Sequence, residues 1–346
     1  MIFAGIDPGT SSYEIFALKD EKPLDKFTIP TKEVKKNPEI LINALKEIDA
    51  DVIAGLSGYG MPIKKFSELN EQDFFLMTLN KDKNSAMGMR RLIDIAIKED
   101  LNIYTIPGVI HLPTIPEWRK MNKIDMGTAD KLCSVCLAFY QLGIERVKKA
   151  NLILVEAGYG FNSFISIKNG KVVDGIGGTS GFPAFSSLGS MDSELAYLLK
   201  PFPKSLLFTG GIKSYLRDRG LNIKKIEDIR NYYKILAEYI IKGIKVAEVS
   251  LGDVDSVILS GKVFGLSEIL DEVKKYYRIT LLKGFGKAKQ SAEGAAIIAN
   301  GIGGGKFKEI IEQLEIHKAK GSVLDYICSD LKQYLMNQNL NTNKSI

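Results

Sequence analysis

Residues 1–18, MIFAGIDPGTSSYEIFAL, decide how the 346-residue chain begins to fold. Two apolar runs, Met1–Ile6 and Tyr13–Leu18, lie on either side of a linker of turn-forming residues, DPGTSS. Short apolar runs separated by such residues are typical of a β-hairpin. The sequence therefore predicts two paired strands at the start of the chain, with a third strand near Asp25–Ile29.

A second hairpin of the same kind is predicted 150 residues further along the chain. A strand over Leu152–Val155 leads into the glycine-containing turn Glu156–Gly160, and a second strand is expected over Ser163–Lys168. The dipeptide Asn169-Gly170 is a strong signal for a two-residue hairpin loop, and Lys171–Val173 begins a third strand. Two such beginnings in one chain indicate an internal repeat.

Helices and strands alternate after each hairpin. The spacing of apolar and small residues predicts helices over residues 37–48, 87–98, 130–142, 192–199, 226–249, 267–276 and 292–300. Short apolar runs predict further strands over residues 51–56, 102–106, 257–259 and 279–282. We therefore expect two α/β lobes, over residues 1–150 and 151–336, followed by a polar, disordered tail over residues 337–346.

The composition is that of a soluble, globular protein. A chain of this length exceeds what one hydrophobic core usually serves, and 45% hydrophobic with 25% charged residues is an ordinary balance. No apolar run approaches the roughly 20 residues that cross a bilayer, and the N-terminus enters a strand without a signal peptide. Three cysteines argue against a disulfide framework. A cytoplasmic protein that does not enter a membrane is expected.

The net charge of +6 does not by itself indicate a nucleic-acid-binding protein. The lysines are scattered as pairs near predicted helix ends and loops, such as Lys35-Lys36 and Lys274-Lys275. A solvated surface explains this pattern better than a basic patch does. No nucleic-acid partner is expected.

The linker of the first hairpin has the composition of a phosphate-binding turn. A phosphate needs backbone N–H groups, small side chains that allow close approach, and hydroxyl donors. These features are combined in the run Gly9, Thr10, Ser11 and Ser12. Asp7, at the end of the strand, is suited to hold Mg²⁺ through water. The same residue types are common in plain turns, so a hairpin loop without a ligand is the alternative.

Two later segments extend this pattern. The turn of the second hairpin offers small and polar residues for a second phosphate contact, namely Gly158, Gly160 and Asn162. The buried strand near residues 257–259 runs into a small-residue turn, where an adenosine could lie against the backbone, formed by Ser260, Gly261 and Lys262. The order and spacing of the three segments are more specific than any one of them.

In this order, the three segments resemble the two phosphate motifs and the adenosine motif of the acetate kinase–sugar kinase–heat-shock chaperone–actin superfamily. The resemblance extends over nearly the whole chain. It implies two ribonuclease-H-like lobes, each a mixed β-sheet flanked by helices, with ATP and Mg²⁺ bound in a cleft between them.

Within that superfamily, residues 169–183, NGKVVDGIGGTSGFP, are similar to the acyl-kinase form. Butyrate and acetate kinases have such a hairpin, followed by an aspartate-and-glycine loop that ends in Gly-Phe-x-Pro or a close relative. The resemblance assigns Gly178 to the nucleotide site. The full sequence looks like an archaeal-type family of proteins described as predicted butyrate kinases.

Two features depart from the superfamily pattern. Butyrate and acetate kinases begin the second phosphate turn with histidine, and chaperones and sugar kinases with aspartate, whereas this chain has Glu156. A carboxylate there would repel phosphate unless it holds the metal, so Glu156 is expected to be a metal ligand together with Asp7. In acetate kinase, arginines neutralise the transferring phosphoryl group. By chain order only, the candidates for this role here are Arg90 and Arg91. A solvated helix face is the alternative for both.

Two further carboxylates are candidates for the chemistry. Asp125 lies where superfamily members carry a metal-binding or basic aspartate, just before Thr128, an expected helix N-cap. Glu293 opens the small-residue helix that packs behind the nucleotide in relatives, where it would orient Mg²⁺ or simply favour the helix N-terminus. By contrast, Cys133 and Cys136 lie in an apolar helix and are expected to serve packing.

These residues favour phosphoryl transfer from ATP to a small carboxylate. Such an acceptor is already ionised at neutral pH and needs no strong general base, in keeping with a chain that has two histidines. The alternatives are a sugar or polyol kinase with Asp125 as base, and an ATPase switch or scaffold without a small acceptor. The choice of acceptor is expected to lie in loops 58–62, 107–123 and 175–187. Both a monomer and a homodimer are compatible with the sequence.

Overall fold

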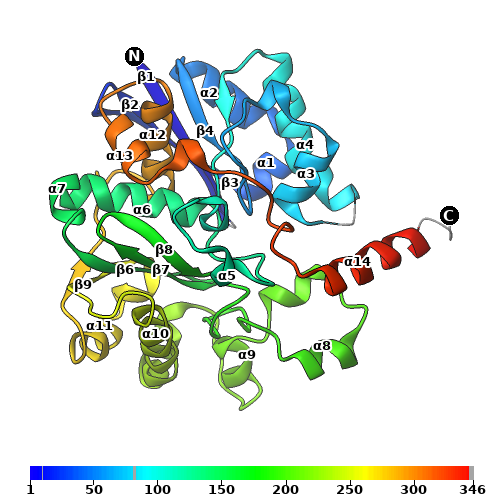
Figure 1. Ribbon diagram of the computed structural model, residues 1–346, viewed down its shortest axis with the longest axis vertical. Coiled ribbons are helices and arrows are strands. Elements are labelled where there is room, and N and C mark those ends of the chain that lie inside the picture. Colours follow the sequence, from blue (N-terminus) through cyan, green and yellow to red (C-terminus); the bar gives the residue numbers. More distant parts are fainter. Residues whose placement is uncertain (10, 81–82, 343–346) are drawn as a thin grey trace.

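The computed structural model describes residues 1–9, 11–80 and 83–342, which form two five-stranded sheets (Figure 1). The first sheet has the strand order β3-β2-β1-β4-β5, and the second has the order β10-β9-β6-β7-β8. In each sheet the first three strands along the chain pair antiparallel, and the last two extend the sheet in parallel. Two mixed sheets built on one plan confirm the predicted α/β repeat.

The strands are short and the helices differ widely in length. The first sheet contains β1 (Ile2–Pro8), β2 (Ser12–Lys19), β3 (Lys22–Pro30), β4 (Val52–Gly55) and β5 (Ile103–Tyr104). The second contains β6 (Asn151–Ala157), β7 (Asn162–Lys168), β8 (Lys171–Ile176), β9 (Ser256–Ser260) and β10 (Ile279–Leu281). The helices are α1 (Thr31–Lys36), α2 (Glu39–Ile48), α3 (Glu71–Thr78), α4 (Lys83–Lys98), α5 (Glu117–Lys120), α6 (Ala129–Leu142), α7 (Ile144–Val147), α8 (Ser193–Leu199), α9 (Ile212–Arg217), α10 (Tyr233–Glu248), α11 (Ser267–Lys274), α12 (Gln290–Ile302), α13 (Lys308–Gln313) and α14 (Ser329–Thr342).

Several elements differ from the sequence prediction. Helices α3, α9, α13 and α14 were not predicted. In α3 the apolar residues are consecutive, Phe74–Met77, and do not recur at helical spacing. The helix predicted over residues 226–249 is a 3₁₀ turn, Ile226–Tyr232, followed by α10. Residues 337–342 continue helix α14, where a disordered tail was expected, and residues 343–346 lie outside the described part of the chain.

The elements stack in layers around three hydrophobic cores (Figure 1). Helices α2 and α4 cover the outer face of the first sheet with side chains such as Leu45 and Ile93. Helices α10 and α11 cover the outer face of the second sheet with side chains such as Ile240 and Ile269. Helices α6 and α12 lie between the sheets and share one core with the inner faces of both. Alternate residues of the central strands therefore belong to different cores, as Phe3 and Ala4 of β1 do.

Helix α12 packs against the first sheet although it follows the second sheet in the sequence. A Cβ atom on Gly5 of β1 would lie 2.2 Å from the backbone nitrogen of Ala296 in α12. A Cβ atom on Gly294 of α12 would lie 1.9 Å from the carbonyl oxygen of Cys133 in α6. The boundary predicted at residue 150 thus separates the two sheets but not the helices, since α12 was expected to belong to the second lobe.

The two cysteines of the central core both lie on helix α6. Cys133 and Cys136 are buried free thiols, and burial raises the pKa of both. Such thiols are poor nucleophiles and metal ligands, in line with the packing role expected. Within the described ranges, no helix is long and apolar enough to cross a membrane.

Gly294→Ala is expected to destabilise the protein, because the added methyl group would overlap backbone atoms of α6 that cannot rotate away. Overpacking of this kind typically costs about 1–3 kcal/mol, which urea unfolding would measure as a lower free energy of unfolding. Gly265→Ala is the matched control, since nothing lies within 4 Å of a Cβ atom at that position. Equal stability of the two variants would contradict the close contact between α6 and α12.

Candidate functional site

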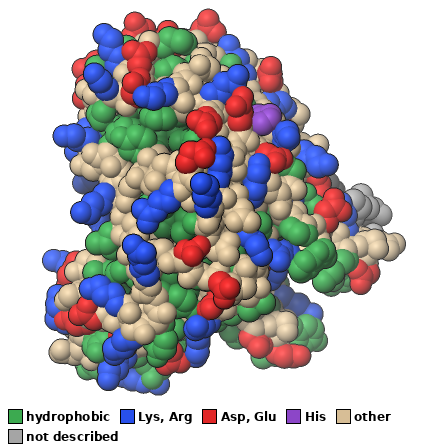
Figure 2. Space-filling view, turned by 60° about the vertical axis from the view of Figure 1, so that its left-hand side comes forward, with side chains coloured by type: hydrophobic (Ala, Val, Ile, Leu, Met, Phe, Trp, Pro, Cys, Tyr) green, Lys and Arg blue, Asp and Glu red, His purple; other side chains and the backbone are tan. Residues whose placement is uncertain are grey.

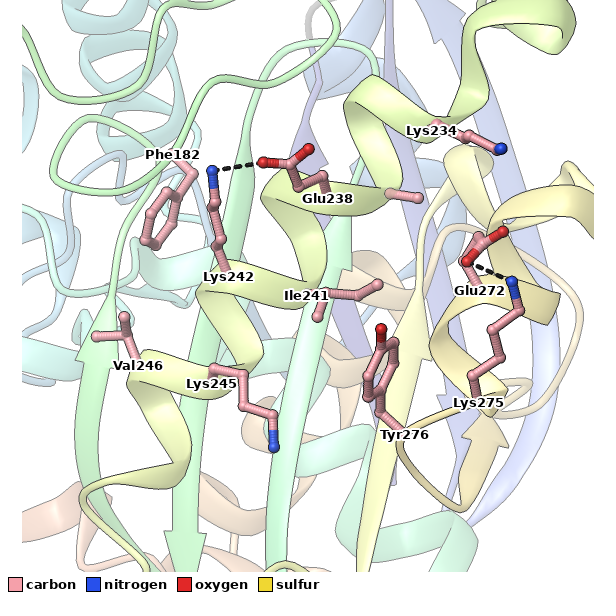
Figure 3. Close-up of a pocket in the computed structure, with 11 residues that line it drawn as sticks. Phe182, Lys234, Glu238, Ile241, Lys242, Lys245, Val246, Glu272, Lys275 and Tyr276 are labelled. Carbon is pink, nitrogen blue, oxygen red and sulfur yellow. Dashed lines mark hydrogen bonds and ion pairs between the residues drawn. The ribbon is translucent and has the colours of Figure 1, made fainter.

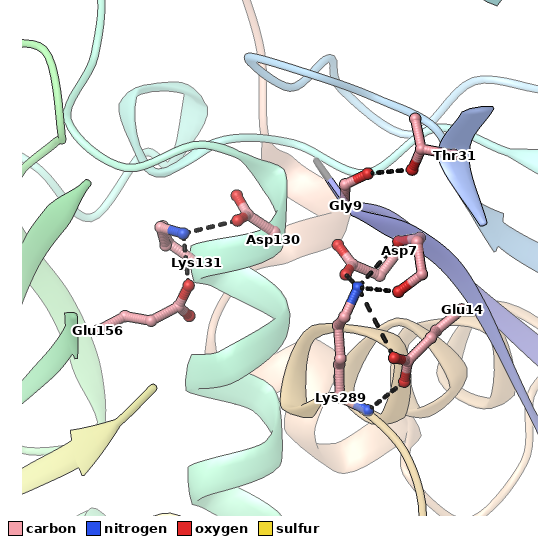
Figure 4. Close-up of polar contacts among 9 residues, drawn as sticks. Asp7, Gly9, Glu14, Thr31, Asp130, Lys131, Glu156 and Lys289 are labelled. Atoms are coloured by element: carbon pink, nitrogen blue, oxygen red, sulfur yellow. Dashed lines mark hydrogen bonds and ion pairs between the residues drawn. The ribbon is translucent and has the colours of Figure 1, made fainter. Parts of the chain in front are cut away.

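Two carboxylates occupy equivalent places in the two hairpins. Asp7 is the second-last residue of β1, and Glu156 is the second-last residue of β6. The N-terminal turn of α6 lies between these two strand ends and contributes Asp130 and Lys131 (Figure 4). The internal repeat therefore brings the acidic residues of the two phosphate-like turns to one place between the sheets.

The negative charge of Glu156 is neutralised within the protein. The Lys131 ammonium lies 2.5 Å from Oε1 of Glu156 and 2.6 Å from Oδ2 of Asp130. The Ser134 hydroxyl donates to the other Glu156 oxygen at 2.7 Å. Burial favours the neutral amine, but the two carboxylates raise the pKa of Lys131 above its ordinary value. Glu156, expected to be a metal ligand, thus has both oxygens engaged by side chains of α6.

A second lysine, Lys289, lies at the turn of the first hairpin. It immediately precedes α12, and its ammonium donates to the carbonyl oxygen and hydroxyl of Ser12 at 2.8 and 3.0 Å. The same nitrogen lies 3.5 Å from Asp7 Oδ2 and 3.7 Å from Glu14 Oε1 (Figure 4). A Cβ atom on Gly9 would lie 2.7 Å from the backbone carbonyl oxygen of Ser12, so glycine suits this turn. Sequence reasoning missed Lys289, because nothing local links it to a turn 280 residues away.

Among the carboxylates of this site, Asp7 is the one whose negative charge is neutralised least by nearby positive charges. It is 8% exposed, and its pKa is raised from 3.8 to about 6. Burial is the main cause, and the negative charges of Asp130 and Glu156 act in the same direction. The positive charges of Lys289 and Lys131 oppose the shift without cancelling it. A cation or a proton at Asp7 would therefore relieve an unfavourable charge.

The glycines of the second turn stand in open space. Nothing lies within 4 Å of a Cβ atom built on Gly158 or Gly160, and neither has a left-handed φ. Gly178 differs, because a Cβ atom there would lie 2.5 Å from the Phe161 side chain. Neither close packing nor a left-handed φ therefore requires glycine at Gly158 or Gly160.

The predicted adenosine segment lies beside the second turn. Gly261 has a φ of +106°, and a Cβ atom on it would lie 2.1 Å from the carbonyl oxygen of Ala157. Ser260 is buried and pairs in register with Glu156, whereas Lys262 is exposed. The structure therefore brings residues 260–262 against the end of β6.

Asn162 is fully buried at the start of β7. Its side-chain nitrogen donates to the carbonyl oxygen of Pro183 at 3.1 Å. Its Oδ1 has no hydrogen-bond partner among the described residues, and the same holds for the hydroxyl oxygens of Ser163 and Ser187. The Asn162 side chain thus ties the second turn to the glycine-rich loop instead of pointing to the surface.

Asp125 holds the glycine-rich loop in place. Its Oδ2 accepts hydrogen bonds from the backbone N–H and the hydroxyl of Thr179, both at 2.9 Å, and its Oδ1 accepts one from Gly127 N at 3.1 Å. A Cβ atom on Gly177 would lie 1.8 Å from the same carboxylate. Thr128, the expected N-cap of α6, is at the cap position but makes no side-chain cap bond, because its hydroxyl donates to Asp130.

Glu293 is fully buried in the first turn of α12. Its carboxylate accepts hydrogen bonds from the backbone N–H groups of Phe285, Lys287 and Ala288 at 2.7–2.9 Å. These bonds fix the loop that leads directly to Lys289. Glu293 thus positions that lysine, rather than presenting a free carboxylate to a ligand.

The remaining predicted residues are dispersed. Arg90 is exposed on α4 and pairs with Glu71 and Asp94, so it is not part of the cluster around Asp7. Ser11 is exposed at the first turn, and Arg91 is exposed on α4. Thr10 lies outside the described residues.

A groove of about 610 Å³ lies on the outer side of the second lobe, between α10 and α11 (Figure 3). Four of its charged side chains form two pairs, Lys242 with Glu238 at 2.6 Å and Lys275 with Glu272 at 2.7 Å. None of the predicted site residues lines it. The groove is therefore separate from the cluster where the two hairpins meet.

The fold is that of the acetate and propionate kinases. An acetate kinase from Porphyromonas gingivalis superposes with a TM-score of 0.54 at 14% identity, over 85% of this chain and 97% of that one. A propionate kinase from Francisella tularensis superposes with a TM-score of 0.54 at 12% identity, over 85% of this chain and 98% of that one. An acetate kinase from Entamoeba histolytica superposes with a TM-score of 0.53 at 14% identity, over 80% of this chain and 87% of that one.

By sequence, the chain belongs to the family described as protein of unknown function (DUF1464), which matches residues 5–329. No curated protein matches the chain in sequence. At the identities found, the structural likeness establishes the two-lobed fold.

Asp7→Asn is expected to stabilise the unliganded protein at neutral pH. Because the folded-state pKa of about 6 exceeds 3.8, ionisation of Asp7 lowers stability. This cost is absent below about pH 4 and complete above about pH 6. The difference between the two pKa values corresponds to at most about 3 kcal/mol, so a gain of about 1–3 kcal/mol at pH 8 should shrink as the pH falls to 4.

Urea unfolding of wild type and variant at both pH values measures this gain, with the exposed Asp253→Asn as control. A loss of stability in Asp7→Asn at pH 8 would mean that Lys289 and Lys131 fully compensate the charge.

Proposed function

We propose that the protein is an ATP-dependent phosphotransferase that phosphorylates a small carboxylate, as a butyrate kinase does. The observation that carries this proposal is the open space at Gly158 and Gly160. Glycine costs conformational entropy on folding, and neither position needs it for its φ or for packing. A phosphate that approaches the backbone closely is the physical reason for glycines at such a turn.

The charges around the two turns suit a bound triphosphate. Lys289 supplies a positive charge at the first turn, next to the Ser12 hydroxyl. Lys131 neutralises Glu156, whose free charge would otherwise repel phosphate at the second turn. Positioning and charge neutralisation of this kind are what phosphoryl transfer requires of a protein.

The donor set also fits Mg²⁺ held largely by phosphate and water. Among the described residues, no group of three acidic, histidine or cysteine side chains could hold a metal directly. Mg²⁺ commonly binds through one or two carboxylates together with substrate phosphates and water. Asp7 is the carboxylate suited to this role, since its charge is the least compensated. When bound, Mg²⁺ would neutralise phosphate charge.

The hydrogen bonds that Asp125 accepts are compatible with a carboxylate acceptor, which needs no base. In the transfer, an acceptor carboxylate oxygen forms a bond to the γ-phosphorus of ATP, while the bond from that phosphorus to the β–γ bridging oxygen breaks. The products are an acyl phosphate and ADP, and no proton has to be removed. A sugar or polyol hydroxyl would need a base, and Asp125, the candidate for that role, already accepts three hydrogen bonds.

The surface supports a small-molecule partner rather than nucleic acid. On the face shown in Figure 2, lysine and arginine side chains are spread out and interleaved with acidic ones. A cytoplasmic location, with the protein a monomer or a homodimer, belongs to the same proposal.

The double variant Gly158→Ala/Gly160→Ala should fold as stably as wild type but bind ATP more weakly, because the methyl groups meet no protein atoms and occupy the space of the phosphates. ATP with Mg²⁺ at 100 times its dissociation constant should stabilise wild type by about 2.7 kcal/mol. Thermal unfolding with and without the nucleotide measures both effects. An equal shift in both proteins would remove the second turn from the nucleotide site.

Purified protein with ATP, Mg²⁺ and short-chain carboxylates is expected to form acyl phosphate, which hydroxylamine traps as a coloured hydroxamate. Parallel reactions with sugars and polyols should give no phosphorylated product. Phosphorylation of a sugar would support the sugar-kinase alternative. Slow phosphate release with every acceptor would support the ATPase switch.

A further inference from the structure

A lysine of the second half of the chain reaches the first lobe. Lys204 begins a 3₁₀ turn, Lys204–Phe208, shortly after α8. Its ammonium donates a hydrogen bond to the carbonyl oxygen of Thr78 at the end of α3. The same nitrogen lies 4.9 Å from the centre of the Tyr59 ring, in the loop that follows β4. Lys204 thus bridges elements that are about 125 residues apart in the sequence.

Lys204 contacts one of the three loops expected to choose the acceptor, and a series of contacts links that loop to the other two. Tyr59 belongs to loop 58–62, and a Cβ atom on Gly108 of loop 107–123 would lie 2.3 Å from the Tyr59 carbonyl oxygen. Burial, with the nearby charge of Asp125, raises the pKa of Tyr59 to about 12. Asp125 in turn binds Thr179 of loop 175–187. Lys204 adds a positive charge at the Tyr59 end of this series of contacts.

The charge of Lys204 has no acidic counterpart. In the described ranges, no carboxylate lies within ion-pair distance of its ammonium, whereas Lys131 has two and Lys289 has two. The side chain is half-buried, and burial lowers the pKa of Lys204 below its ordinary value. A partly desolvated ammonium held by a carbonyl oxygen and a ring is poorly compensated. An anionic ligand beside Lys204 would neutralise the charge of this ammonium.

We propose that Lys204 binds the carboxylate of the acceptor and thereby selects anionic over neutral acceptors. This inference rests on the proposed function. The arginine expected from chain order to supply such a charge, Arg90, is exposed and already paired with Glu71 and Asp94. Among the described residues, Lys204 has no carboxylate partner, and it lies over Tyr59 of loop 58–62. Charge-assisted hydrogen bonds from an ammonium to a carboxylate are stronger than those to a neutral hydroxyl.

Two substitutions separate the charge from the contact with Thr78. Lys204→Gln keeps a donor for the Thr78 carbonyl oxygen but removes the charge, and Lys204→Arg keeps the charge. Lys204→Gln should raise the KM for the carboxylate about 10–100-fold, with the KM for ATP unchanged, and Lys204→Arg should restore most of the affinity. Lys200→Met is the control, because Lys200 is exposed and stacks on Tyr197 at 3.9 Å.

An unchanged carboxylate KM in Lys204→Gln overturns the proposal and leaves Lys204 as a contact between the lobes. So does an equal rise in the KM values for ATP and carboxylate, since that indicates a general loss of structure. Unfolding in urea checks that each variant is folded.

Failure of the proposed function can be told apart from failure of this inference. If wild type forms no acyl phosphate with any acid, the proposed function fails, and binding of butyrate alone then decides the role of Lys204. Butyrate should raise the melting temperature of wild type and Lys204→Arg but not of Lys204→Gln. No shift in wild type, or an equal shift in all three proteins, overturns the inference.

Discussion

The close packing of α12 against β1 and α6 is the contact on which the rest of the structure depends. Gly5 and Gly294 let three backbones approach to distances that no side chain would allow. This contact joins the two halves of the repeat into one central core. It also sets the position of Lys289, which precedes α12, and so delivers a positive charge to a turn near the other end of the chain.

The site that results is a balance of buried charges. Asp7, Asp130 and Glu156 come from three different elements, and Lys131 and Lys289 lie among them. The balance is uneven, because Lys131 is shared by two carboxylates while Asp7 keeps a raised pKa. A site that is left partly uncompensated in the free protein is stabilised by the ligand that completes it. The same reasoning applies to Lys204, whose ammonium has no carboxylate partner among the described residues.

Several candidate residues support the site instead of facing a ligand. Glu293 fixes the loop before Lys289, and Asp125 fixes the glycine-rich loop through Thr179. Sequence position alone could not separate these roles, because a buried carboxylate that binds backbone N–H groups and one that binds a metal have the same residue type and a similar place in the chain. Arg90 is a different case: its helix was predicted, but its exposed side chain pairs with Glu71 and Asp94, away from the cluster around Asp7.

The sequence by itself determined the two hairpins, the mixed α/β repeat and the acidic residue at each strand end. These features follow from short-range patterns: alternating apolar residues, turn formers, and glycines at fixed offsets from a strand. Only the tertiary structure decided which charges meet. Apart from Asp130, the sequence neighbour of Lys131, the partners of Lys289, Lys131 and Lys204 lie 25 to 282 residues away in the sequence, from Glu156 for Lys131 to Asp7 for Lys289. Such contacts arise when the helices pack between the two sheets, and no local pattern encodes them.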